Sequence, residues 1–286
     1  MNSDGQILPI YFHMPKNAGT YINHMFFSKL QTDDMAKNYI NVYKGDKIIA
    51  RVICAQNLSS NSYLNKIPIS SHVVNIDNNS KPTLYNSELY SVGLKDLQLE
   101  NLGVKFICIT PAGFRNYKKE IYNLIPNNKS IREFICLRSP YNRLQSLYSY
   151  NYRQSNNYSC KTSLISFTEY INSNLLEEGW LIRNILDIPD SVLLTEDHYN
   201  KACSILDNFD LMDFNNISND ASRFYNMYYK THIKDTINLS TFKHKINVTN
   251  DKIDIDFNML DVKTQNRFTE HQKWDIKLFD RYMKTK

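Results

Sequence analysis

Apolar residues near the start of the chain change from a continuous run to a helical spacing within about thirty positions. Residues 7–13 form a short apolar run that stops before Pro15, which predicts a buried strand. From Thr20 onward the apolar positions fall on one face of a helix: Ile22, Met25, Phe26 and Leu30. The chain therefore begins with a predicted strand, a loop and a helix.

The next stretch predicts two further strands and then a polar region. Segments 39–43 and 47–54 are apolar runs of strand length, and Gly45-Asp46 between them is a plausible turn. Residues 55–101 are polar and rich in Asn and Ser, which is typical of loops with short elements.

Two later segments repeat the pattern of an apolar run followed by a helical spacing. Residues 106–110 and 134–138 resemble each other at an offset of 28 positions, and we interpret them as two strand–helix units of one parallel sheet. A third unit is predicted from a strand at 192–194 and a helix at 199–209.

The order of these elements predicts an α/β fold with three layers, α/β/α, around a mostly parallel central sheet. Residues 210–256 show no clear pattern, and 266–283 predict a closing helix. No linker or low-complexity tract divides the chain, so we expect residues 1–286 to form a single domain.

Composition excludes several classes of protein. Hydrophobic residues make up 42% of the chain and charged residues 22%, as in an ordinary globular protein. The net charge of +5 suits an anionic ligand, but no block of Lys and Arg stands out, so we expect no nucleic-acid partner. The acceptor class and the oligomeric state stay open at this point.

Cysteines and hydropathy bear on the compartment. The five cysteines are odd in number and form no CxxC pair, and Cys108 and Cys136 stand in apolar runs, so we expect buried free thiols. There is no apolar span of membrane length and no charged start of a signal peptide, which predicts a cytoplasmic protein without an integral membrane span. A Golgi lumenal domain lacking its anchor would look the same. No cluster of His, Cys and Asp has metal-ligand spacing, so we expect no metal.

The segment His13-Met14-Pro15-Lys16-Asn17-Ala18-Gly19-Thr20 joins the first predicted strand to the first helix. Such a loop suits an anion, because the first N–H groups of a helix are unpaired and its dipole favours negative charge there. Gly19 permits close backbone approach, Thr20 adds a hydroxyl and Lys16 adds a positive charge. The segment is not a Walker A loop, because the Lys precedes the Gly.

This loop resembles the HxPKxxGT 5'-phosphosulfate loop of carbohydrate sulfotransferases that use 3'-phosphoadenosine 5'-phosphosulfate (PAPS). A second segment, Leu137-Arg138-Ser139-Pro140-Tyr141-Asn142-Arg143-Leu144-Gln145-Ser146, resembles their LRDPxxRxxS segment, with Ser139 in place of the usual Asp. Weaker similarities to galactose 3-O-sulfotransferases and the heparan sulfate 2-O-sulfotransferase type occur in the same order along the chain.

The resemblance implies a P-loop-kinase-like sulfotransferase fold, with PAPS bound by elements at 7–31 and 131–152. Lys16 would act on the leaving 5'-phosphate, and the residues around it, Asn17, Ala18, Gly19, Thr20 and Tyr21, would hold that phosphate. Arg138 and Ser146 would hold the 3'-phosphate, and the acceptor would be a carbohydrate or glycolipid. From the residues alone, Arg138 ends a strand, Ser139 can cap a helix and Pro140 suits its first turn.

The resemblance does not by itself identify the general base. The family often has a His after the strand that precedes the 3'-phosphate segment, but here Thr110-Pro111-Ala112 stands at that position. His72 is the substitute we favour, with Glu120, Glu88 and Asp96 as further candidates. Three readings stay open: a sulfotransferase, a catalytically silent relative that binds a nucleotide or glycan, and a P-loop nucleotide kinase, which the loop pattern disfavours.

Overall fold

The computed structural model describes residues 7–32, 35, 38–56, 65–67, 89–127, 129–155, 165–229 and 254–284. The described chain forms two compact units. Unit 1 comprises residues 1–136 and 216–246, and unit 2 comprises residues 137–215 and 247–286. Whether they act as the single domain expected from the sequence stays a prediction.

The seven strands of unit 1 form a mixed sheet in the order β4-β5-β2-β3-β6-β1-β7. Their bounds are β1 Ile7–Phe12, β2 Asn38–Lys44, β3 Lys47–Cys54, β4 Asn65–Ile67, β5 Leu89–Gly93, β6 Val104–Ile109 and β7 Ser130–Leu137. Strand β1 lies between β6 and β7 and is parallel to both. Strand β3 is antiparallel to its neighbours β2 and β6, and β4 is antiparallel to β5. Strand β5 is parallel to β2, so five strands share one direction and the expected mostly parallel α/β sheet is confirmed.

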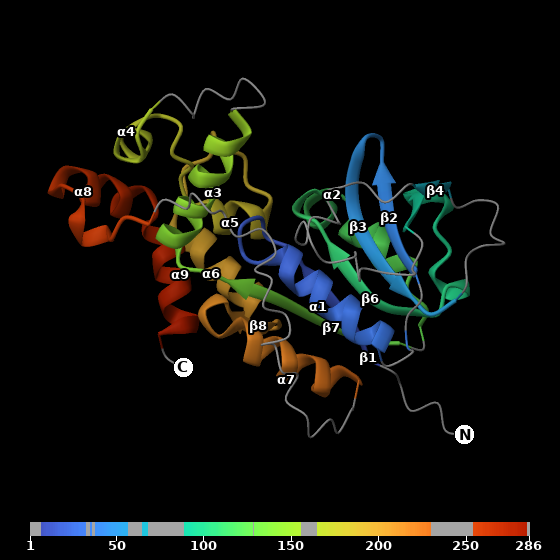
Figure 1. Ribbon diagram of the computed structural model, residues 1–286. Helices are drawn as coiled ribbons and strands as arrows, with labels where there is room; N and C mark the ends of the chain where they lie inside the picture. Colours follow the sequence, from blue (N-terminus) through green and yellow to red (C-terminus); the bar gives the residue numbers. More distant parts are fainter. Residues whose placement is uncertain are drawn as a thin grey trace, which may run out of the picture. The chain divides into compact units, whose positions relative to one another are not determined.

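Helices cover both faces of this sheet (Figure 1). Helix α2 (Pro111–Asn123) packs on one face, where the ring of Phe114 stacks on that of Phe12 at 3.9 Å. Helices α1 (Gly19–Thr32) and α7 (Ile217–Tyr229) cover the other face, where Phe26 of α1 lies 4.8 Å from Phe106 between ring centres.

The two faces differ because successive residues of a strand point to opposite sides. Ile107 and Ile109 join the aliphatic cluster under α2, with Leu8 and Ile10 of β1. Phe134 of β7 lies in the aromatic cluster on the other face, where its ring contacts those of Tyr11, Phe26, Phe106, Phe224 and Tyr228.

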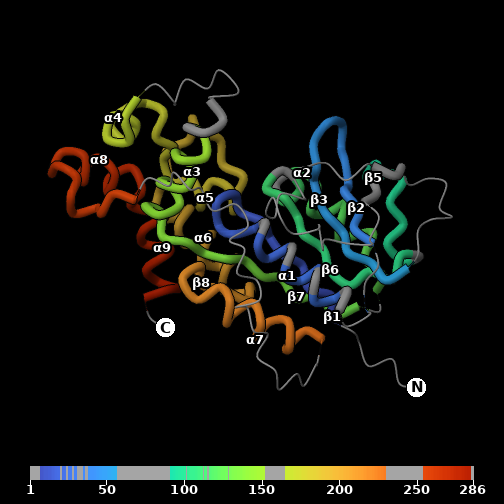
Figure 2. The backbone as a smooth tube through the Cα atoms, viewed as in Figure 1, coloured from blue at the N-terminus to red at the C-terminus, as the bar shows by residue number. Residues whose placement is uncertain are grey.

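The β2–β3 hairpin was predicted correctly (Figure 2). Gly45 has φ 61° and nothing within 4 Å of a Cβ position, so this turn uses the left-handed freedom of glycine. The expected strand–helix units β6-α2 and β7-α3 are also confirmed, with both strands parallel to β1.

Unit 2 is mostly helical. It contains α3 Pro140–Ser155, α4 Phe167–Asn172, α5 Trp180–Leu186, α6 Glu196–Leu206, α8 Val262–His271, α9 Lys273–Met283 and the short strand β8 Asp210–Asp213. Short 3-10 turns occur in both units at Leu94–Asp96, Leu99–Asn101, Phe214–Asn216 and Phe257–Met259. Ser139 caps α3, because its Oγ accepts from Asn142 N–H at 3.2 Å, and Pro140 opens that helix as expected.

Two expected elements of unit 2 were wrong. Residues 192–194 form no strand, and Leu193 is 74% exposed. This short apolar run instead precedes α6, and Leu194 alone of the three is buried. The expected closing helix at 266–283 is two helices, α8 and α9, with a break at Gln272, whose side chain donates to Glu177 O.

Two predictions from composition can be compared with the described chain. Cys54, Cys108, Cys136 and Cys203 are buried free thiols as expected, and Cys160 lies outside the described residues. None of the described helices combines the length and the apolar character that crossing a bilayer requires.

Candidate functional site: an anion-binding loop at the carboxyl end of β1

The loop between β1 and α1 turns sharply at residues 15–18 and has an unusual backbone. Lys16 (φ 67°) and Ala18 (φ 59°) are left-handed, and Asn17 between them is not. A left-handed alanine costs about 1–2 kcal/mol. Such alternation turns successive N–H groups toward one side and makes a concavity for an anion. Strain of this kind is typical of functional loops.

The helix that follows adds further donors to this concavity. The first intrahelical bond of α1 runs from Ile22 N–H to Ala18 O at 3.0 Å. The preceding N–H groups at the start of a helix have no partner within it and carry the positive end of its dipole. The loop and helix therefore present the donor set that a phosphate or sulfate needs.

Two buried residues hold the loop in place. Met14 is fully buried, and its carbonyl accepts from Asn17 N–H at 3.2 Å. The Asn17 side chain, 1% exposed, donates from Nδ2 to Cys136 O at 3.0 Å and so ties the loop to β7. Asn17 thus anchors the loop through both its side chain and its N–H. The resemblance implied that Asn17 would hold the phosphate, but its N–H is already bonded to Met14 O within the loop.

The other loop residues named from the sequence lie in the same place. Pro15 is exposed and Lys16 partly exposed, which is suitable for a side chain that meets a ligand. Thr20 is the second residue of α1, and its side chain lies outside the described residues. The Tyr21 hydroxyl is 3.2 Å from Ser218 Oγ of α7, so Tyr21 contributes to packing between these helices.

His13 lies directly beneath the loop. A Cβ on Gly19 would come within 1.8 Å of His13 Cδ2 and 1.9 Å of its Nε2, so the imidazole edge fills the space that glycine leaves. Arg51 of β3 lies on the other side of the ring, with its Nη1 at 3.5 Å from His13 Nδ1. Burial, and then the charge of Arg51, lower the pKa of His13 from 6.5 to about 3.

The second predicted segment lies in unit 2. Arg138 follows Leu137 at the end of β7, and its guanidinium carbon is 4.0 Å from the centre of the Phe214 ring. Ser146 is partly buried on α3, whereas Leu144 and Tyr148 on the same helix are buried. Their role in binding a 3'-phosphate stays a prediction.

Arg143 belongs to the same motif, but it is a structural residue here. Its side chain is 6% exposed, lies 3.8 Å over the Trp180 ring and pairs with Glu177 at 3.4 Å. Burial lowers the pKa of its guanidinium, and the charges of Glu177 and Asp275 oppose that shift. Arg143 therefore stabilises unit 2.

The structure gives no general base at the position where the family often has a His. Thr110 there is the N-cap of α2 and accepts from Gly113 N–H at 3.3 Å. Its hydroxyl is also within 2.9 Å of Ile48 O and 3.1 Å of Ile49 O. His72 and Glu88 lie outside the described residues, and the outside candidates Glu120 and Asp96 are exposed.

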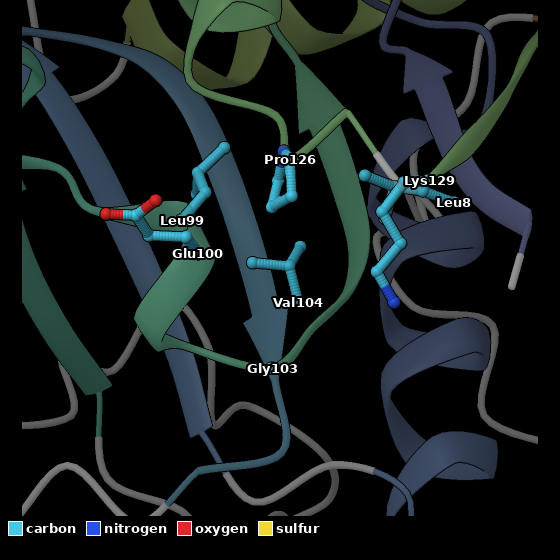
Figure 3. Close-up of a pocket in the computed structure, with 7 residues that line it drawn as sticks. All are labelled: Leu8, Leu99, Glu100, Gly103, Val104, Pro126 and Lys129. Atoms are coloured by element: carbon cyan, nitrogen blue, oxygen red, sulfur yellow. The ribbon is translucent and has the colours of Figure 1, made fainter. Parts of the chain in front are cut away.

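A cavity of about 330 Å³ lies elsewhere in unit 1, at the amino ends of β1 and β6 (Figure 3). It is lined by Leu8, Leu99, Glu100, Gly103, Val104, Pro126 and Lys129. Strands β1 and β6 run in parallel from this cavity toward the loop, so the cavity and the loop lie at opposite ends of these strands. One carboxylate and one ammonium among apolar groups do not form a catalytic set.

Sequence reasoning missed Arg51, although a signal was present. Arg51 is the only charged residue in the apolar run from Ile48 to Cys54. A charge inside a buried strand is uncommon and marks either a paired group or a site. Among the described residues, no group of three or more His, Cys, Asp and Glu could hold a metal ion.

Comparison with known proteins adds nothing to this geometry: no protein-family model, no curated protein and no solved structure matches the chain.

Proposed function

We propose that this protein is a sulfotransferase that moves the sulfuryl group of PAPS to a hydroxyl of a carbohydrate or glycolipid. The observation that supports it most is the backbone of the loop after β1, where left-handed Lys16 and Ala18 precede the first turn of α1. This arrangement suits a doubly charged anion, and the residues in it match the sulfotransferase pattern. A P-loop-kinase-like sulfotransferase fold is part of the proposal.

Each end of PAPS has a proposed partner. The N–H groups of Ala18, Gly19 and Thr20 would hold the 5'-phosphosulfate, and Lys16 would stabilise the charge that develops on the leaving oxygen. Arg138 and Ser146 would bind the 3'-phosphate, for which a guanidinium is well suited. No metal is needed for these contacts.

The reaction is a single in-line transfer. The acceptor oxygen forms a bond to sulfur while the bond from sulfur to the 5'-phosphate oxygen breaks, and 3'-phosphoadenosine 5'-phosphate (PAP) leaves with the bonding electrons. A base takes the acceptor proton. His13 is a poor candidate, since its pKa is lowered to about 3, so His72 stays the proposed base.

The test is binding of PAP by calorimetry together with transfer of labelled sulfate from PAPS to a panel of glycans. We expect Lys16→Met to lower the transfer rate by about 100-fold or more, because it removes charge stabilisation of the leaving group. Lys47→Met makes the same charge change at an exposed position of the β2–β3 hairpin and serves as control. Absence of PAP binding in the unmodified protein would overturn the proposal.

One observation favours a second candidate, a silent relative that binds a nucleotide or glycan without transfer. At the family's usual base position, Thr110 Oγ1 is occupied by Ile48 O, Ile49 O and Gly113 N–H. Tight PAP binding without sulfate transfer to any acceptor would select this candidate over the enzyme.

A further inference from the structure

We propose that Arg51 is a positioning residue for the loop from His13 to Thr20, the anion loop. Arg51 fixes His13 as a neutral ring with its proton on Nε2 and so makes Nε2–H a donor to the bound anion. The identity of that anion rests on the proposed function, whereas the state of the ring does not. The argument depends on contacts within unit 1.

The donor chemistry of arginine determines which ring nitrogen carries the proton. A guanidinium has N–H donors only and no acceptor. Because Arg51 Nη1 faces His13 Nδ1 at 3.5 Å, Nδ1 must accept, and the single proton of the neutral ring is then on Nε2. A second proton on Nδ1 would place two cations and two donors against each other.

The opposite edge of the ring faces the loop. Nε2 and Cδ2 lie against Gly19, the first residue of α1. His13 is partly exposed, and no described residue accepts a hydrogen bond from its Nε2. The ring of Tyr11 also stacks on that of His13, with 5.9 Å between the ring centres. The Nε2–H group is thus positioned at the loop and open to a ligand.

Arg51 itself lies in a row of neutral polar groups across the sheet. The strand register places Asn41, Arg51, Cys108 and Tyr11 side by side on the face covered by α1. Asn23 of α1 reaches the same row and donates to Cys108 Sγ at 3.3 Å.

The row contains no counter-charge for the guanidinium. Among the described residues, no carboxylate pairs with Arg51. The Oδ1 atoms of Asn41 and Asn23 are buried without a hydrogen-bond partner. The polar groups of this row therefore do not satisfy one another's hydrogen bonds completely. A partly buried guanidinium without a carboxylate makes the loop above it more positive and favours an anion there.

The primary test is the ring state of His13, measured by ¹⁵N NMR of the protein without ligand. In the unmodified protein we expect the Nε2–H tautomer and no titration between pH 5 and 8. Arg51→Gln should raise the pKa of His13 and populate the other tautomer. Arg51→Lys, which keeps a donor and the charge, should retain much of the Nε2–H tautomer and of the lowered pKa of His13. Arg132→Gln, an exposed change on β7, is the control.

The secondary test is the affinity for PAP and for inorganic sulfate. Arg51→Gln should weaken both by about tenfold, the size expected for one lost hydrogen bond near a charge. His13→Gln, whose amide nitrogen can replace Nε2, should retain more affinity than His13→Asn, whose amide nitrogen replaces Nδ1.

The outcomes separate the two proposals. If the unmodified protein binds PAP, but His13 is protonated on Nδ1 or is unchanged in Arg51→Gln, this inference is wrong and the proposed function stands. If the ring behaves as expected but neither PAP nor sulfate binds, the proposed function is wrong, and with it the role of Nε2–H as a donor.

Discussion

A glycine at position 19 leaves only enough room for the imidazole of His13. Replacing it with alanine would place a Cβ 1.8 Å from the ring, so the ring or the loop must move. We expect Gly19→Ala to lower the free energy of unfolding by about 1–3 kcal/mol through overpacking. Affinity for PAP should fall by at least about tenfold, because the first turn of α1 shifts.

The control for this change is Gly45→Ala, measured by urea unfolding and calorimetry. Gly45 has φ 61° but nothing within 4 Å of its Cβ position, so the cost there is backbone strain alone, about 1 kcal/mol. Affinity for PAP should not change. Gly19→Ala with unaltered affinity and stability would show that the ring contact does not constrain the loop.

At the scale of elements, helix α9 is attached to helix α5 by one buried carboxylate. Asp275, 1% exposed, accepts from Leu181 N–H at 2.6 Å and Ile182 N–H at 3.1 Å. Burial raises the pKa of Asp275 from 3.8 to about 6, against the opposing effect of these N–H groups and of Arg143 and Arg183. The carboxylate is therefore neutral in the folded protein over a pH range in which it is ionised in the unfolded chain.

The sign of the pH dependence follows from this shift. Between pH 4 and pH 6 the folded state holds more protons than the unfolded state, so the stability contributed by this group decreases as pH rises. The stability of the unmodified protein minus that of Asp275→Asn should fall by about 2 to 3 kcal/mol from pH 4 to pH 7. Trp180 and Trp274, the two tryptophans of the chain, both lie in unit 2 and report its unfolding by fluorescence.

Asp280→Asn on the same helix is the matched control. Its carboxylate pairs with Lys284 Nζ at 2.8 Å, and the lysine side chain is 69% exposed, so removing this pair should change stability by less than about 1 kcal/mol. Equal pH profiles for the two variants would mean that Asp275 is not the group that titrates.

At the scale of the whole molecule, unit 1 is built from two separate segments of the chain, 1–136 and 216–246, and residues 137–215 of unit 2 lie between them in the sequence. Phe134 stands at the end of the first segment of unit 1, and its ring contacts Phe224 and Tyr228 of α7, which begins the second segment. We expect Phe134→Ala to lower the stability of unit 1 by about 3–5 kcal/mol, since a fully buried ring is lost.

Hydrogen exchange of the amides in β1, β6 and β7 measures this effect in unit 1 directly. Met227→Ala, at a position of α7 that is 41% exposed, should change those exchange rates little. Unaltered protection in Phe134→Ala would mean that the aromatic cluster contributes less to unit 1 than its burial indicates.

The sequence by itself determined the elements that local patterns encode. Strand β1, helix α1, the β2–β3 hairpin and the units β6-α2 and β7-α3 were predicted, because apolar runs of strand length, helical spacing and turn residues act over a few positions. The loop from His13 to Thr20 was identified for the same reason. The apolar run at 192–194 misled the prediction, because a run of three residues carries no period.

Tertiary structure alone decided the strand order, the break between α8 and α9, and what lies beneath the loop. Arg51 and His13 are 38 positions apart, and their contact exists because β3 and β1 both flank β6 in a definite register. Hydropathy along the chain does not encode which strands become neighbours. The loop from His13 to Thr20 could thus be identified in the sequence, whereas the contact between Arg51 and His13 beneath it became visible only once the sheet had formed.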